Sequence, residues 1–132
     1  MYVRFITPER LRAGVSAGLF GAAYDCRDDE DLGEALRAAI RLELEWFGEY
    51  LPRPDERSFL VRSRKVWWPD GICWFRAEAR AMIAHAFALR ALLGECGVLV
   101  TKVSTCRPGQ ILYRDAWQIV AKPEAATPTV WC

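Results

Sequence analysis

One apolar stripe constrains the fold of this chain more than any other feature. Large apolar side chains recur every three or four residues, at Leu32, Leu36, Ile40, Leu44, Phe47 and Leu51. This spacing follows the α-helical period of about 3.6 residues, so the stripe occupies one helix face. Prolines at positions 52 and 54 cannot continue a helix, and acidic residues before the stripe suit a helix N-terminus. We therefore expect a long helix over Asp29–Tyr50.

Two further segments carry helix signals. Thr7-Pro8-Glu9 combines a hydroxyl N-cap, a first-turn proline and an acidic side chain, which predicts a helix from there to about Phe20. Another helix is expected from about Arg76 to Glu95, with Gly97 just beyond its end. Alanines form a stripe along this last helix, and we expect them to pack against glycines of the first helix. The residues of that expected contact are Ala77, Ala81, Ala84, Ala88 and Ala91 on one side and Gly14, Gly18 and Gly21 on the other.

The C-terminal third of the chain is typical of antiparallel sheet. Val98–Cys106, Ile111–Arg114 and Trp117–Ala121 are rich in β-branched or alternating apolar residues. Between the first two, Pro108 and Gly109 stand where a type II turn requires proline and glycine. We expect a three-stranded meander here, joined by one or two further strands, at Ser58–Trp68 and at Tyr2–Ile6.

Together these segments predict an α+β fold, in which two or three helices cover one face of a small antiparallel sheet. A length of 132 residues suits a single domain, placed at 1–122, with an extended tail at 123–132. The net charge of +1 provides no overall field toward nucleic acid or a membrane. Five cysteines without a Cys-x-x-Cys pair favour free thiols and a cytoplasmic location. No apolar run is long enough to span a bilayer, so no membrane partner is expected.

Three of the six tryptophans fall within eight residues, at Trp67, Trp68 and Trp74. Adjacent side chains in a strand point to opposite faces, so Trp67 and Trp68 cannot both enter the same core. We expect about half of the aromatic side chains here to be core packing and the rest to lie at an interface. Tryptophan and arginine are enriched at the energetic centres of interfaces. The expected binding surface consists of Arg62, Arg64, Lys65, Trp67, Trp68, Trp74 and Arg76.

Three functional hypotheses follow. The first is a non-enzymatic module that binds a protein partner, or a second copy of itself, through that surface. The second is binding of RNA or single-stranded nucleic acid, with cations on phosphates and tryptophans stacked on bases, although Asp70 interrupts the basic run. The third is a small enzyme whose pocket is lined by Cys73 or by His85, the only histidine.

Motifs for catalysis and cofactor binding are missing from the sequence. The chain has no Gly-x-Ser-x-Gly, no P-loop and no Gly-x-Gly-x-x-Gly. His85 has no second ligand one helical turn away, as a zinc-binding helix would require. We therefore expect no catalytic residues, no metal and no cofactor, which favours the interaction hypothesis over the enzyme.

The second half of the chain resembles a group of small uncharacterised bacterial proteins. The resemblance lies in Cys73-Trp74-Phe75-Arg76 and, beyond a helix, in a pattern that runs from Pro108 to Pro123. It implies a stand-alone bacterial domain and no particular activity. Within that pattern, Tyr113, Asp115 and Gln118 are expected to form a polar cluster at one end of the meander, with Asp115 shaping a turn.

Overall fold

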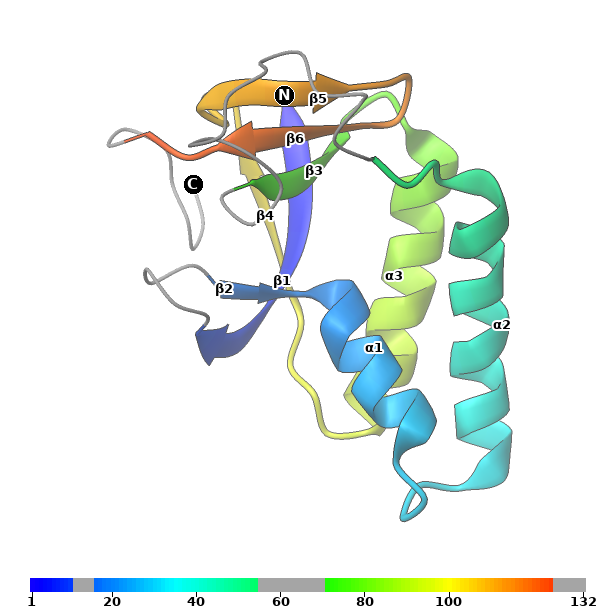
Figure 1. The fold of residues 1–132 in the computed structure, drawn as a ribbon. Coiled ribbons are helices and arrows are strands. Elements are labelled where there is room, and N and C mark those ends of the chain that lie inside the picture. The colour runs from blue at the N-terminus through cyan, green and yellow to red at the C-terminus, as the bar shows by residue number, and fades with distance from the viewer. Residues whose placement is uncertain (11–15, 55–70, 125–132) are drawn as a thin grey trace.

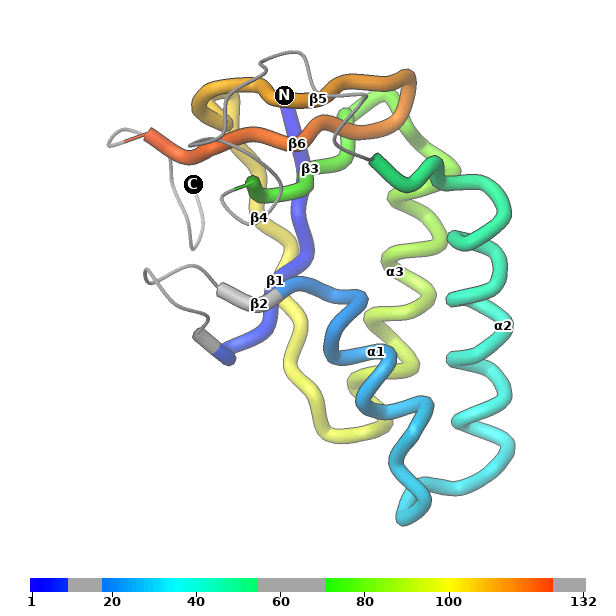
Figure 2. Tube along the Cα trace, in the orientation of Figure 1, coloured from blue at the N-terminus to red at the C-terminus, as the bar shows by residue number. Residues whose placement is uncertain are grey.

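The computed structural model describes residues 1–10, 16–54 and 71–124, and the rest of the chain is drawn in grey in Figures 1 and 2. The described residues form three helices and six strands, which confirms the α+β class. Figure 1 shows all three helices on one side of a strongly twisted sheet. In chain order the elements are β1 (Tyr2–Arg10), β2 (Ser16–Gly18), α1 (Leu19–Asp28), α2 (Glu34–Tyr50), β3 (Ile72–Arg76), α3 (Arg80–Glu95), β4 (Thr101–Thr105), β5 (Gln110–Arg114) and β6 (Gln118–Lys122).

Every strand pair in the sheet is antiparallel, as expected, but the pairing of the strands differs from the prediction. The strands lie in the order β2-β1-β3-β6-β5, and β4 pairs with β1 rather than with β5. The expected meander is therefore wrong in its first strand, while its last two strands do form the β5–β6 hairpin. Strand β4 pairs along its whole length with residues 2–6 of β1. The turn sequence at Pro108 and Gly109 therefore did not decide which strand β4 pairs with.

The predicted helix at the apolar stripe is confirmed, with a later start. It is α2, and Ile40, Leu44 and Phe47 of the stripe are buried. The helix ends at Tyr50 as the prolines predict. Figure 2 shows α2 and α3 side by side, with the chain running in opposite directions in the two helices.

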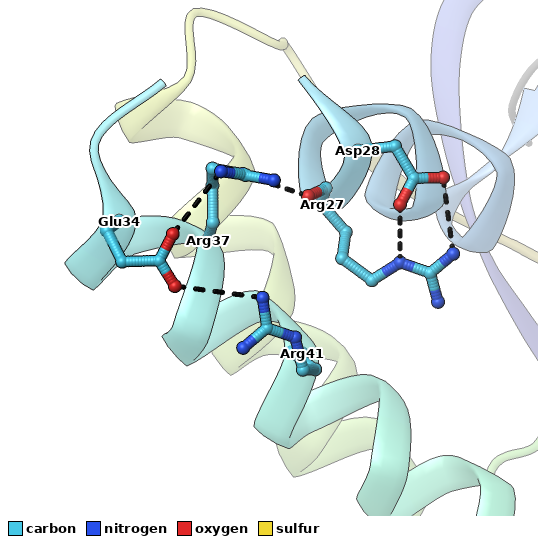
Figure 3. A network of polar contacts seen from close by, with 5 residues as sticks. All are labelled: Arg27, Asp28, Glu34, Arg37 and Arg41. Atoms are coloured by element: carbon cyan, nitrogen blue, oxygen red, sulfur yellow. Dashed lines mark hydrogen bonds and ion pairs between the residues drawn. The ribbon is translucent and has the colours of Figure 1, made fainter. Parts of the chain in front are cut away.

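The acidic segment before α2 connects two helices instead of starting one. Helix α1 continues to Asp28, whose carboxylate accepts a hydrogen bond from Arg27 Nε at 2.9 Å. Arg37 of α2 donates from Nε to the backbone oxygen of Arg27 at 3.0 Å and from Nη1 to Glu34 at 3.3 Å. Figure 3 shows this network, in which Arg41 also approaches Glu34. The hydrogen bond from the Arg37 side chain to the Arg27 backbone oxygen thus ties α2 to the end of α1.

The helix predicted from Thr7 to about Phe20 is wrong for residues 7–10 and 16–18, which are strand. Strand β1 continues through Thr7, Pro8 and Glu9, and the first helix begins only at Leu19. Beyond Ile6 the pairing partner of β1 is β2, with an irregular register between Ile6 and Arg10. A proline that lacks an N–H is tolerated at such an irregular, edge-like position. The helix-start signal of Thr7-Pro8-Glu9 was therefore overridden by strand pairing that the local sequence does not encode.

Strand β3 was not predicted, because apolar side chains lie on both of its faces, with Trp74 and Phe75 both buried, and its residues do not alternate in polarity. Phe75 packs toward the helices in a cluster with Val3 and Phe5 of β1. Trp74, its neighbour, packs in a second cluster with side chains from other strands, among them Val103 and Ile119. Helix α3 consequently starts at Arg80 rather than near Arg76.

The expected contact between the alanine stripe and the first helix is wrong. Ala81, Ala84, Ala88 and Ala91 are exposed on α3, which buries Met82, Ala86, Leu89 and Leu93 instead. A side chain added at Gly21 would meet nothing within 4 Å. The face of α3 that carries the larger side chains is the buried one, because these side chains bury more apolar area than methyl groups do.

His85 joins the two long helices. Its Nδ1 lies 2.8 Å from Glu43 Oε2 of α2, and its ring stacks on Trp46 with centroids 3.6 Å apart. We expect His85→Ala to lower the free energy of unfolding by about 1–2 kcal/mol, because it removes both a partly buried polar contact and a ring contact. Urea denaturation measures this loss. Arg41→Ala is the control, since its exposed 3.8 Å ion pair with Glu34 contributes less than about 1 kcal/mol; equal losses in the two variants would contradict the assigned role of His85.

Candidate functional site

Most of the predicted binding surface lies outside the described residues. Arg62, Arg64, Lys65, Trp67 and Trp68 all fall in the segment 55–70, as does the predicted strand Ser58–Trp68. Their role as a binding surface stays a prediction. Two predicted members of the surface, Trp74 and Arg76, belong to β3 and are described.

Trp74 is a core residue and not the exposed anchor that the sequence suggested. Its side chain is only 2% exposed and packs against Ile6, Ile72 and Ala121. Trp74 and Phe75 do enter different clusters, as adjacent side chains of a strand must, but both clusters are buried, so neither residue is left at an interface. The second face of the sheet is lined by side chains from several strands, so the sheet has a core on both sides.

Arg76 is held by the β5–β6 hairpin. Its Nη1 donates to the backbone oxygen of Asp115 at 3.2 Å, and its Nε lies 3.8 Å from Glu78. The predicted polar cluster is present at this hairpin: Asp115 accepts hydrogen bonds from the Tyr113 hydroxyl at 2.7 Å and from the side chain of Gln118 at 3.1 Å. Gln118 also donates to the backbone oxygen of Pro52 at 2.6 Å, which ties the hairpin to the chain just after α2. The cluster has a structural role.

A large cavity, partly open to solvent, lies among the described residues. Its volume is about 1410 Å³, and its walls come from β1, β2, α1, α2, β3, β6 and the residues that follow α2. Three phenylalanines on its wall form a group that we call the phenylalanine triad: Phe20 of α1, Phe47 of α2 and Phe75 of β3. Their ring centroids lie 4.9 to 6.4 Å apart. Such a mainly apolar cavity with a few polar groups is typical of sites for small ligands.

The cavity forms where the sheet divides. Strand β3 pairs with β1 at Tyr2 and Val3, whereas β2 pairs with β1 from Ile6 onward. Arg4 and Phe5 lie between these two pairings, and both line the cavity. The backbone of a central strand therefore places a guanidinium and a phenyl ring at the cavity wall.

Two polar side chains of the cavity, Arg4 and Cys73, influence each other. Burial lowers the pKa of Arg4, and the nearby Cys73 opposes that change. The Cys73 side chain is open to the cavity, but the surrounding protein desolvates it and raises its pKa to about 11, against the influence of Arg4. At neutral pH the thiol is therefore protonated and uncharged, and it is a weak nucleophile.

The structure does not bring Cys73 and His85 to a common wall. Cys73 lines the cavity, whereas His85 is engaged with Glu43 and Trp46 between α2 and α3. Cys26, Cys73, Cys96 and Cys106 are free, as predicted, and Cys132 lies outside the described residues. Burial and a hydrogen bond with Cys96 raise the pKa of Cys26 to about 11.

Sequence reasoning missed Arg4 and the phenylalanine triad as site residues. Arg4 alternates with Val3 and Phe5, a pattern that marks it as the polar side of a strand. That signal is the ordinary one for a solvent-facing arginine, so it does not distinguish a cavity from bulk water. Phe47 belongs to the apolar stripe of α2, where core packing already accounts for it.

Within the described ranges, no group of three or more His, Cys, Asp or Glu side chains gathers as metal ligands would. Of the helices described, none combines the length and the apolar character that crossing a bilayer requires. Comparisons of this chain with protein families, with curated proteins and with solved structures found no match.

Proposed function

We propose that this protein binds a small, largely apolar molecule in the cavity at the phenylalanine triad. The observation that carries the proposal is a cavity of about 1410 Å³ whose aromatic wall is assembled from three different elements. Burial of apolar ligand surface against such a wall contributes about 25 cal/mol per Å² removed from water. The cavity therefore offers an apolar molecule a substantial driving force for binding.

Binding suits the described wall better than catalysis does. Its cysteine, Cys73, is protonated at neutral pH, and His85, the chain's only histidine, lies elsewhere. Binding of a protein partner or of nucleic acid through residues 62–68 remains a separate hypothesis. The described residues give it no support, because Trp74 is buried and Arg76 is engaged with the hairpin.

Gly48 offers a direct test of the cavity. It lies on α2, lines the cavity, and a Cβ added there would meet nothing within 4 Å. We expect Gly48→Leu to occupy part of the cavity and to weaken binding of the neutral fluorescent probe N-phenylnaphthylamine at least about tenfold, or about 1.4 kcal/mol. The helix itself should gain stability, because leucine favours a helix by up to about 1 kcal/mol over glycine.

The matched control is Gly94→Leu. Gly94 is also a helical glycine with open space at its Cβ, but it lies on α3 outside the cavity wall. Titration of the probe by fluorescence should give the same affinity for Gly94→Leu and the parent protein. The proposal fails if the folded parent does not raise the fluorescence of the probe, or if the two leucine variants weaken binding equally.

A further inference from the structure

We propose that Cys26 and Cys96 form a dithiol site, at which a peroxide converts two free thiols into a disulfide bond. Neither cysteine is among the described residues that line the cavity, so the inference is independent of the proposed function. Cys26 lies in the last turn of α1, and Cys96 caps the C-terminus of α3. Figure 1 shows these two helix ends at the same end of the helical layer, where α1 packs against α3.

The fold holds the two thiols together. A hydrogen bond joins the side chains of Cys26 and Cys96. Cys26 is only 7% exposed and belongs to the core cluster of the three helices, against which the half-buried Cys96 also packs. The carbonyl oxygen of Cys26 accepts a hydrogen bond from the N–H of Asp29 at 3.3 Å. The N–H of Cys96 donates to the backbone oxygen of Leu93 at 3.0 Å, so both backbones are fixed beside the sulfur atoms that would bond.

The surroundings give the two cysteines different roles. Cys96 is partly open to solvent, so a peroxide in solution can reach its sulfur. Burial, the hydrogen bond with Cys96 and the nearby carboxylates of Asp29 and Asp25 raise the pKa of Cys26 to about 11. At neutral pH Cys26 is therefore a shielded, protonated thiol that reacts slowly with a peroxide. We expect Cys96 to be oxidised first, and Cys26 to react with the oxidised sulfur of Cys96.

The oxidation takes place in two steps. The Cys96 thiolate attacks one oxygen of hydrogen peroxide, the O–O bond breaks, and the released hydroxide takes up the proton of the Cys96 thiol to become water. The sulfur of Cys26 then attacks the resulting sulfenic acid, the S–O bond breaks, and the oxygen leaves as water with the proton of Cys26. The two sulfur atoms lose two electrons, and the peroxide is reduced to two water molecules. Because the second step is intramolecular, the proximity of the sulfur atoms compensates for the low thiolate fraction of Cys26.

The test treats the reduced, folded protein with hydrogen peroxide, alkylates the remaining thiols after denaturation and maps the peptides by mass spectrometry. We expect a disulfide between the peptides of Cys26 and Cys96. In Cys26→Ser, Cys96 should accumulate as a sulfenic acid that dimedone traps, whereas in Cys96→Ser the buried Cys26 should stay a free thiol. Cys73→Ser is the matched control, because Cys73 lies on β3 beside Arg4, and this variant should form the disulfide at the rate of the parent protein.

The disulfide should also stabilise the fold. It would close a loop that contains α2, β3 and α3, and this restriction of the unfolded chain should raise the melting temperature by roughly 10 °C until dithiothreitol reverses it. Cys96→Ser should show no such rise after peroxide treatment. A disulfide that forms equally fast in urea, or that lowers the melting temperature, would show that the fold does not hold the two sulfur atoms for bonding. Bonds from Cys96 to other cysteines in place of Cys26 would overturn the proposal as well.

Discussion

Gly109→Ala is expected to lower the free energy of unfolding by about 3 kcal/mol or more, with a fall of roughly 10 °C in melting temperature. Gly109 has φ +101°, a conformation that residues with a Cβ rarely adopt. A Cβ at this position would also overlap the backbone oxygen of Lys122. Backbone atoms at the end of β6 cannot move aside without disturbing its pairing with β5 and β3.

The variant Gly97→Ala separates the two causes of the stability loss expected for Gly109→Ala, which are backbone strain and overlap with Lys122. Gly97 has φ +84°, but a Cβ there meets nothing within 4 Å, so this variant carries the backbone strain without the overlap. We expect it to cost about 1 kcal/mol. Thermal unfolding followed by circular dichroism measures both variants. If Gly97→Ala and Gly109→Ala lose the same stability, the overlap with Lys122 contributes nothing. The turn at Gly109 must then be able to move away from β6.

Trp74→Ala should lower the free energy of unfolding by about 3–5 kcal/mol, the usual cost of truncating a large buried aromatic side chain. Trp74 is 2% exposed and fills a cluster built from several strands of the sheet, so no neighbouring side chain can collapse fully into the space it leaves. Trp74→Phe should cost much less. It keeps most of the ring, and the indole N–H it removes has no hydrogen-bond partner among the described residues.

Trp117→Ala is the control for Trp74. Trp117 is 38% exposed beside the β5–β6 turn, and its backbone N–H, which donates to Asp115, is retained in the variant. Urea denaturation should show a much smaller loss for Trp117→Ala than for Trp74→Ala. A Trp74→Ala protein as stable as Trp117→Ala would contradict the core role of Trp74 and restore it as a candidate for an exposed interface.

Features that depend on neighbouring residues were predicted well. The apolar stripe predicted α2, and the prolines after it predicted where the helix ends. The alternation in Trp117–Ala121 predicted β6, and Asp115 organises the turn before it. Gly97 and Gly109 both have the positive φ that their positions suggested. Each of these features is decided by side-chain periodicity or by backbone freedom within a few residues.

Predictions that required the partner of a segment failed. Thr7-Pro8-Glu9 has the composition of a helix start, yet it extends β1. Strand β4 is followed by a good turn sequence at Pro108 and Gly109, yet it pairs with β1 at the other end of the chain. Trp74 was predicted to be an interface residue, yet it is buried. The side chains that cover its face of β3 come from strands far away in sequence, which no local pattern reveals. In each case the free energy of pairing or burial exceeds the local preference, which is about 1 kcal/mol per residue or less.

The sequence by itself determined that this chain has a long amphipathic helix, a C-terminal hairpin and an α+β core, because these follow from periodicity along the backbone. Only the tertiary structure decided the candidate site. Arg4, Phe20, Phe47 and Cys73 come from four different elements, and no local pattern links them. They line one cavity because β1 exchanges its partner from β3 to β2 between Val3 and Ile6, and the helices pack against the opening that results.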